Sequence, residues 1–184
     1  MTALLHAWAE GDPSAPDALL AAVYEELRRQ AAWHMRRQAG GHTLEPTDLV
    51  HEAYLRLARQ PGARWEGRGH FFRVAGRVMR TVLVDHARAH DAGKRGGAGA
   101  VRVTLGAAGA GRADAAGEVD VLALDAALGR LAAIDAQKAR VVELRYFAGF
   151  TIEQTAEALG VSAATVKREW TAARAWLRHE LRAP

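Results

Sequence analysis

The chain of 184 residues contains no cysteine, which excludes disulfide bonds and thiolate metal sites. It has no run approaching the roughly 18 apolar residues that a membrane-spanning helix needs, so no membrane association is expected. Its first residues, MTALLHAWAEGDPSAPD, have neither a basic start nor a long apolar run, so a secretory signal is not expected either. Strand-like alternation of apolar and polar residues is also absent. Together these absences predict a helical protein that works in the cytoplasm.

The sequence has enough apolar residues, 49% of the chain, to form a folded core, and its many alanines and arginines favour helix. The net charge is +4, but it is unevenly distributed. Seven basic and two acidic residues lie between positions 68 and 95, a local net charge of +5. The net charge of this one segment therefore exceeds that of the whole chain, as expected for a surface that binds a polyanion.

The clearest boundary is the glycine- and alanine-rich segment GKRGGAGAVRVTLGAAGAGRADAAGE, which starts at Gly93. Compact domains rarely contain a structureless run of this length, so the segment is predicted to be a flexible linker. The chain is accordingly divided into a domain of residues 1–92, a linker of residues 93–120 and a domain of residues 121–184. The predicted fold class is all-α, with two small helical domains joined by the linker and a helix-turn-helix in the C-terminal one.

Apolar residues at helical spacing predict four helices in each domain. In the first domain the first, second and fourth helices lie at about 2–10, 17–38 and 70–91. The third begins after an N-cap at Thr47 or Asp48. In the second domain they lie at about 121–131, 136–146, 151–159 and 162–181. Arg73, Arg77 and Arg80 recur at i, i+4 and i+7 along one flank of the fourth helix.

The last two predicted helices have the layout of a helix-turn-helix unit. Thr151 and Gln154 form a capping box, and Gly160 is a turn residue that tolerates positive φ. The buried face of the last helix is predicted to consist of Val166, Trp170, Ala173 and Leu177. The exposed donors for DNA bases and phosphates would be Ser162, Thr165, Lys167 and Arg168. The alternative interpretation is an ordinary helical hairpin with a solvated polar face.

Several motifs occur together in the order found in one family. TDLVHEAYLRLA resembles region 2.2, and FFRVAGRVMRTVLVDHARAHDAGKRGG resembles regions 2.3 and 2.4, of the small extracytoplasmic-function sigma factors of bacterial RNA polymerase. LAAIDAQKARVVELRYFAGFTIEQTAEALGVSAATVKREWTAARAWL resembles region 4. The resemblance covers about residues 17–92 and 121–181. It implies a subunit that directs core polymerase to promoters and promotes transcription initiation, and not an enzyme.

The resemblance implies three binding surfaces. Polymerase would be bound by one face of the helix that follows residue 46, through Asp48, His51, Glu52 and Leu55. The minus-ten element would be bound by a loop and the helix after it, through Arg64, Trp65, Arg68, His70, Arg73, Arg77 and Arg80. The minus-thirty-five element would be read as duplex through Ser162, Thr165, Lys167 and Arg168.

Each surface has a structural alternative. The acidic helix face can be merely solvated, and Trp65 can belong to the core instead of stacking on a base. Core positions are expected for Phe71, Phe72 and Trp170. The neighbouring Leu144, Tyr146 and Phe147 are expected to pack the second domain, in a region that the family also uses against the polymerase flap.

The implied partners are core RNA polymerase, through its clamp helices and flap, and promoter DNA, and small sigma factors are often held by an anti-sigma protein. Binding would be bipartite, because the linker keeps two weakly binding domains at a high effective concentration on one polymerase. The alternative function is a stand-alone helix-turn-helix regulator, which predicts homodimerisation and tight duplex binding without polymerase.

Three features resemble enzyme or metal motifs but fail a requirement. HEAYL has Leu55 where the zinc motif H-E-x-x-H needs its second histidine. His86 and His90 have the i, i+4 spacing of a metal pair, without a third ligand in view. AGKRGG lacks the serine or threonine that follows the lysine of a phosphate loop. A metal-dependent helical hydrolase is thus disfavoured, and no metal or cofactor is expected.

Overall fold

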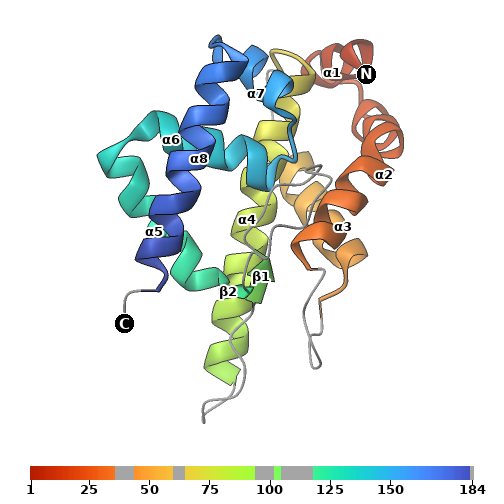
Figure 1. Ribbon diagram of the computed structural model, residues 1–184. Helices are drawn as coiled ribbons and strands as arrows, with labels where there is room; N and C mark the ends of the chain where they lie inside the picture. Colours follow the sequence, from red (N-terminus) through yellow and green to blue (C-terminus); the bar gives the residue numbers. More distant parts are fainter. Residues whose placement is uncertain (36–43, 60–64, 94–101, 105–117, 183–184) are drawn as a thin grey trace.

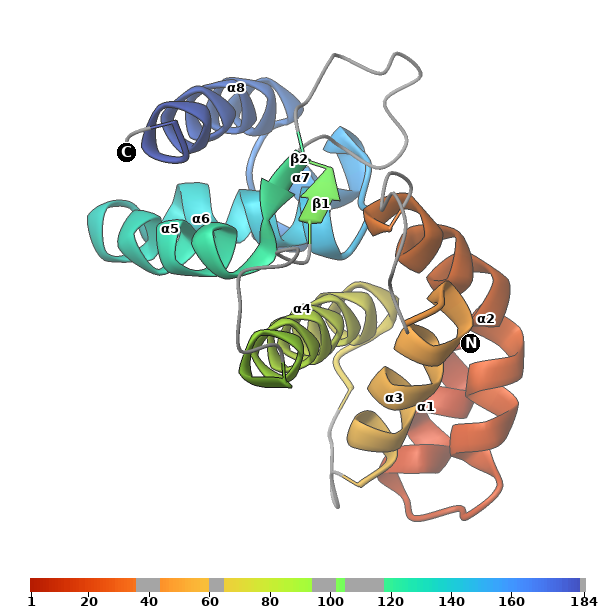
Figure 2. The same cartoon turned by 90° about the horizontal axis from the view of Figure 1, so that it is seen from below.

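The computed structural model describes residues 1–35, 44–59, 65–93, 102–104 and 118–182. Nearly all of these residues lie in helices, which confirms the predicted all-α class. The helices form an N-terminal and a C-terminal group, and the longest helix of the N-terminal group lies between the two (Figure 1, Figure 2). How the groups meet therefore depends on that helix.

The N-terminal group consists of α1 (Thr2–Ala9), α2 (Ala15–His34), α3 (Pro46–Ala58) and α4 (Arg68–Gly93). α3 packs against α2 and α4, and α1 packs against α2. Leu19, Val23 and Leu27 repeat at helical spacing on α2 and are at most 3% exposed, so this side of α2 faces the core. Tyr54 of α3 donates a hydrogen bond to Asp17 of α2. Burial and this bond raise the pKa of the Tyr54 hydroxyl to about 12.

The C-terminal group consists of α5 (Val121–Ile134), α6 (Ala136–Val142), the π-helical turn η1 (Glu143–Phe147), α7 (Ile152–Leu159) and α8 (Ala163–Glu180). α8 packs against α5, α6 and α7. Aspartates begin two of these helices, because a carboxylate can accept from the free N–H groups of a first helical turn. Asp120 accepts from the N–H of Leu122 at 3.2 Å, and Asp135 accepts from that of Lys138 at 3.0 Å.

The start of α3 differs from the prediction of an N-cap at Thr47 or Asp48. The N-cap is Glu45, whose N–H donates to the Asp48 carboxylate at 2.9 Å. The reason is Pro46, which needs no hydrogen-bonding partner for its nitrogen and has a φ already suited to the first helical position. The helix therefore starts at Pro46, and Asp48 belongs to its first turn.

The helix predicted at 136–146 is also different, because its α-helical part ends at Val142 and continues as η1. The N–H of Ala148 donates to the carbonyl of Glu143, five residues earlier, at 3.0 Å. All residues from Leu144 to Ala148 are buried. Such continuous burial occurs where a segment is enclosed on several sides, and η1 indeed contacts α4, α6 and α7.

Two short strands lie in the segment predicted to be a flexible linker. β1 (Arg102–Thr104) pairs antiparallel with β2 (Glu118–Asp120), with Val103 opposite Val119. The pairing satisfies backbone groups that would otherwise need water, and it brings the chain to the N-cap of α5. The rest of the predicted linker, residues 94–101 and 105–117, lies outside the described residues.

Two glycines of the C-terminal group provide a matched test of the backbone at the α7–α8 turn. Gly160 has φ +64°, whereas Gly129 lies within α5, and neither has any atom within 4 Å of an added Cβ. Gly160→Ala should reduce the free energy of unfolding by about 1–2 kcal/mol, because a left-handed conformation is unfavourable for a residue with a Cβ. Gly129→Ala should raise it by about 0.5–1 kcal/mol, because alanine favours helix. Urea unfolding measures both, and equal effects would contradict the left-handed turn.

Candidate nucleic-acid interface

The turn between α7 and α8 is formed by local hydrogen bonds, most of them predicted from the sequence. Thr151 accepts from the N–H of Gln154 at 3.1 Å, and the Gln154 side chain accepts from the N–H of Thr151 at 2.9 Å. Gly160 ends α7 in the left-handed conformation, and the N–H of Val161 then donates to the carbonyl of Ala156. The predicted capping box and turn glycine are both confirmed. Together they fix the direction in which α8 leaves α7.

One side of α8 is buried and the other carries polar side chains. The predicted apolar face is confirmed, since Val166, Trp170, Ala173 and Leu177 are at most 7% exposed. The Trp170 ring also lies 5.6 Å from the Arg145 and Arg174 guanidinium carbons. This face holds α8 against its neighbours by burial of apolar area.

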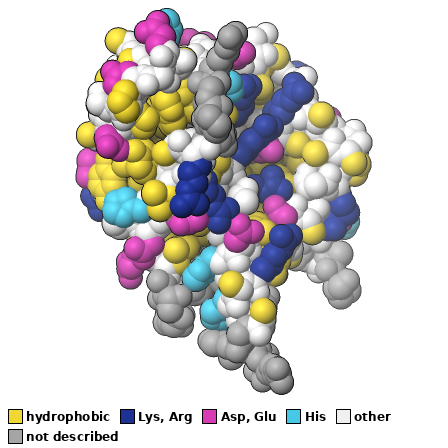
Figure 3. All heavy atoms as spheres, turned by 180° about the vertical axis from the view of Figure 1, so that it is seen from behind, with side chains coloured by type: hydrophobic (Ala, Val, Ile, Leu, Met, Phe, Trp, Pro, Cys, Tyr) yellow, Lys and Arg dark blue, Asp and Glu magenta, His cyan; other side chains and the backbone are white. Residues whose placement is uncertain are grey.

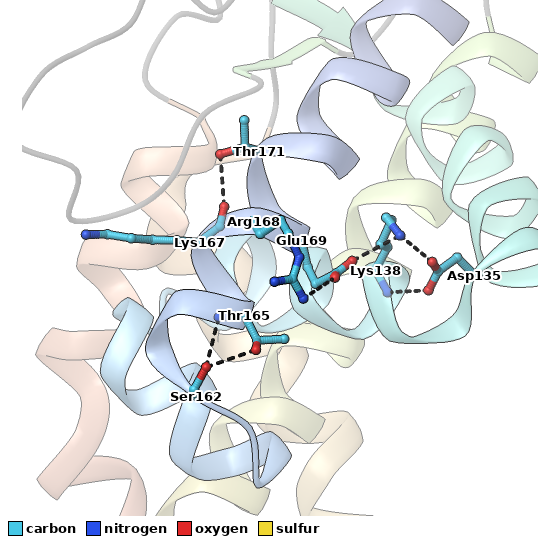
Figure 4. A network of polar contacts seen from close by, with 8 residues as sticks. All are labelled: Asp135, Lys138, Ser162, Thr165, Lys167, Arg168, Glu169 and Thr171. Carbon is cyan, nitrogen blue, oxygen red and sulfur yellow. Dashed lines mark hydrogen bonds and ion pairs between the residues drawn. The ribbon is translucent and has the colours of Figure 1, made fainter.

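The predicted DNA-binding donors lie together at the start of α8 (Figure 4). Ser162 caps the helix by accepting from the N–H of Thr165 at 3.1 Å, and the two hydroxyls are 2.9 Å apart. Lys167 is exposed and extends outward from the helix (Figure 4). The side chain of Arg168 is 70% exposed, and one of its nitrogens lies 3.4 Å from Glu169. The start of α8 thus combines exposed cations with the positive end of a helix dipole.

A charged network that the sequence did not predict supports α8 from its buried flank (Figure 4). Glu169 is only 14% exposed and lies 3.0 Å from the Lys138 amine of α6, which also pairs with Asp135. The bonds to Asp135 and Glu169 raise the pKa of Lys138. The network directs the one acidic side chain of this turn toward α6. The capping Asp135 three residues before Lys138 is a visible local signal, but the partner Glu169 is too distant in sequence to be inferred.

The polymerase-binding residues predicted on α3 share one side of the helix. Asp48 and His51 are exposed, and Leu55 is 47% exposed. The Glu52 side chain lies along its own helix, where it pairs with Arg56 at 3.0 Å. Arg56 also lies 2.7 Å from Asp85 of α4. The exposed part of this surface is therefore made mainly by Asp48, His51 and Leu55.

Trp65 and its neighbours form an aromatic cluster at the start of α4. Trp65 is 7% exposed, and its ring lies 5.1 Å from that of Trp8 and 5.4 Å from that of Phe71. Its indole N–H has no hydrogen-bond partner among the described residues. Phe71 and Phe72 are buried, as expected. In this conformation Trp65 has the core position that was its alternative interpretation.

The other residues predicted to bind the minus-ten element are scattered over several environments. Arg64 lies outside the described residues. Arg68 pairs with Glu26 and lies over the Phe72 ring at 4.7 Å, and the His70 ring accepts from the N–H of Glu66 at 3.3 Å. Arg73 is half-buried and lines a cleft of about 450 Å³ between the two helix groups. This cleft also has acidic and apolar walls, so it is not a simple basic channel.

Arg77 and Arg80 are paired with carboxylates of the C-terminal group. Arg77 donates to Glu143 through two nitrogens at 3.0 and 2.9 Å. Arg80 donates to Asp125 at 2.8 Å, and another of its nitrogens is 3.6 Å from Glu143. Seen from behind, the molecule accordingly shows basic side chains interspersed with acidic ones (Figure 3). Neither Asp125 nor Glu143 was among the sequence-predicted site residues.

The described part of the chain lacks both a metal-binding cluster and a membrane-spanning helix. It contains no group of three or more histidine, aspartate or glutamate side chains able to hold a metal ion. None of its helices combines the length and apolarity that crossing a membrane requires.

Comparison with known proteins identifies the family. A search of curated proteins gave no significant match. The family described as ECF sigma factor matches residues 1–183, which is almost the whole sequence. Members of this family bind core RNA polymerase and promoter DNA, many also have an anti-sigma factor as a partner, and the family is a class of non-enzymatic transcription factors. The match gives the stand-alone regulator no support. The chain therefore belongs to the ECF sigma factor family and acts in transcription initiation.

Proposed function

We propose that this sigma factor divides promoter and polymerase binding among three surfaces. The start of α8 reads the minus-thirty-five duplex, α4 with the loop before it binds the minus-ten element, and the exposed side of α3 binds the clamp helices. The observation that carries the proposal is the start of α8, where four hydroxyl and cationic donors lie in the N-cap and first turns of the helix, outside its buried face. The proposed domains are residues 1–92 and 121–184, with a linker between them.

The composition of the α8 surface fits a major groove. A recognition helix contacts base edges and phosphates with the residues of its first turns. Arg168 has the planar fork that pairs with a guanine edge, whereas Lys167 is a point charge suited to phosphate. The Lys138 pair draws one oxygen of the Glu169 carboxylate toward α6, while the other oxygen lies 3.4 Å from Arg168 and offsets part of its charge. Ser162 and Thr165 add hydroxyl donors beside the helix N-terminus.

The α3 surface fits a protein partner. Leu55 and Ile134 are the large hydrophobic side chains that stand exposed within the described residues, at 47% and 70%. Leu55 is flanked on the same helix face by the exposed Asp48 and His51. An apolar side chain within a polar rim is the usual composition of a protein interface.

Two substitutions on α8 test the minus-thirty-five surface. Arg168→Ala should cost about 1–3 kcal/mol at promoters that carry the preferred base and should relax the preference at that position. Lys167→Ala should weaken use of all promoters similarly. It should also reduce the slope of log affinity against log salt concentration by about one, because one phosphate contact is lost. Both are measured by transcription with core polymerase on a genomic fragment library, with new 5′ ends mapped.

The matched control for these substitutions is Arg178→Ala, in the last turn of the same helix. It removes the same charge roughly 16 Å farther along the axis, since each residue adds 1.5 Å. Promoter choice should not change in this variant. If all three variants behaved alike, or if the protein alone gave a tight sequence-specific duplex shift, the proposed division of roles would be wrong.

The polymerase surface is tested with the two exposed hydrophobic residues. Leu55→Ser should weaken binding to a fragment that contains the clamp helices of the largest polymerase subunit by about tenfold, the usual effect of removing a central interface side chain. Ile134→Ser is the control, because Ile134 lies at the end of α5 in the other helix group. Titration by fluorescence anisotropy gives both affinities. Equal binding by wild type and Leu55→Ser would show that the Leu55 surface of α3 does not contact the clamp helices.

A further inference from the structure

The amine of Lys138 is held in place by the residue that caps its own helix. Asp135 accepts from the Lys138 backbone N–H at 3.0 Å through one carboxylate oxygen, and its other oxygen pairs with the Lys138 amine. Both bonds lie within the first turn of α6. α6 in turn packs against α5, η1 and α8. The Lys138 amine therefore has a defined position beside α8.

Glu169 connects this amine to the exposed surface of α8 (Figure 4). Its Oε2 lies 3.0 Å from the Lys138 amine, and its Oε1 lies 3.4 Å from a terminal nitrogen of Arg168. The side chain of Glu169 is 14% exposed, whereas that of Arg168 is 70% exposed. A carboxylate with so little access to water needs a cationic partner, because burial penalises its charged form. Lys138 supplies that partner on one side, and Arg168 meets the second oxygen on the other.

Arg168 has more donors than one base edge requires. A guanidinium carries five N–H groups in a planar fork, and a guanine edge accepts from two of them. Glu169 contacts one terminal nitrogen of Arg168, so donors for a base remain. A long exposed side chain loses rotamer freedom when it is ordered on DNA, and a contact that orders it beforehand reduces that loss. The Glu169 contact can therefore orient Arg168 without blocking it.

Lys138 determines how the Glu169 charge is shared. With the amine 3.0 Å away, one carboxylate oxygen is kept on the α6 side. Without the amine, Glu169 and Arg168 would favour a contact with two parallel bonds, the geometry in which a carboxylate matches a guanidinium. Such a contact would occupy the donors that read a base. The pair with Lys138 thus keeps the Glu169–Arg168 contact to a single bond.

We propose that Lys138 and Glu169 are positioning residues that set the base preference of Arg168, although Lys138 belongs to α6 and not to the helix that reads DNA. The anchored carboxylate holds the guanidinium in one orientation and leaves two of its donors to a base edge. The inference rests on the proposed function, because it takes Arg168 as a residue that reads the minus-thirty-five element. Neither Lys138 nor Glu169 was among the expected DNA contacts.

The test measures base preference and not binding strength alone. One promoter found with the genomic fragment library is randomised at each position of its minus-thirty-five element and transcribed by the full chain with core polymerase, and the products are sequenced. Arg168→Ala identifies the position that Arg168 reads, since the preference disappears there. At that position Lys138→Met and Glu169→Gln should each reduce the preference about threefold, the size expected from a partly exposed ion pair.

A purely structural role of Lys138 predicts a different result. Weaker packing of α6 on α8 would lower transcription from all members of the library by the same factor and would leave the base preference unchanged. Glu169→Gln keeps the side-chain shape, so it tests the proposal even if Lys138→Met fails to fold. It should also raise transcription from members with non-preferred bases, because it removes a negative charge near phosphate. An unchanged preference in Glu169→Gln would overturn the proposal.

The matched control is Arg130→Met, at the other end of α8. Arg130 of α5 pairs with Glu180 of α8 at 2.7 Å, so it too is a cation on a neighbouring helix that holds a carboxylate of α8. Glu180 is the last residue of α8 and lies about 16 Å along the axis from Glu169, since each residue adds 1.5 Å. Arg130→Met should leave the base preference unchanged. A loss equal to that of Lys138→Met would mean that any weakened support of α8 relaxes the preference, and the positioning role would be wrong.

A combined variant separates the inference from the function on which it rests. In the Arg168→Ala background, Lys138→Met should change the preference at no position, because its effect passes through Arg168. A change in that background would contradict the proposal. If Arg168→Ala alone leaves all preferences intact, the minus-thirty-five role of Arg168 is wrong, and the inference fails with it. If Arg168→Ala removes a preference that Lys138→Met and Glu169→Gln both retain, the proposed function stands and the positioning role fails.

Discussion

The contact between Gly76 and the backbone of Phe147 and Ala148 is the constraint on which the rest of the structure depends. It brings two backbones closer than any side chain would permit at that position. The apolar side of α4 meanwhile closes the core of the N-terminal group through residues such as Ala75 and Met79, both fully buried. One helix thus belongs to two packed interfaces. A shift of η1 on α4 would disturb the Arg77 and Arg80 pairs and the hydrogen bond that Gln30 of α2 donates to the Phe147 carbonyl, because all of them lie around the same contact.

This constraint divides the proposed binding surfaces into two kinds. Ser162, Lys167 and Arg168 at the start of α8 and the Leu55 surface on α3 are exposed as the molecule stands. The Glu169–Lys138 pair also fixes the α8 turn before any DNA arrives. The α4 surface is different, because its arginines are paired and Trp65 is covered by Trp8. Duplex reading therefore needs little rearrangement, whereas strand binding needs at least the arginines to exchange partners.

The features that could be predicted from the sequence are those that depend on residues a few positions apart. The capping box of Thr151, the left-handed Gly160 and the apolar face ending at Leu177 are local, and all three are confirmed. The predicted start of α3 was wrong. Thr47 and Asp48 are both residue types that favour an N-cap, whereas the helix already begins at Pro46, with Glu45 as its N-cap. The partners of Arg77 and Arg80 could not be predicted, since they lie 66 and 45 positions away and depend on how two helix groups pack. The pairing of β1 and β2 is likewise non-local, and strands of three residues show no usable alternation.

The double use of Arg77 and Arg80 limits how α4 can serve as a binding surface. These arginines join α4 to η1 and α5 through Glu143 and Asp125. Guanidinium groups bind carboxylates and phosphates with the same paired donors. Binding of a DNA strand by these two arginines would therefore compete with the contact between the helix groups. Lys167 and Arg168 at the start of α8 are exposed instead, so the two proposed DNA surfaces differ in what DNA must displace.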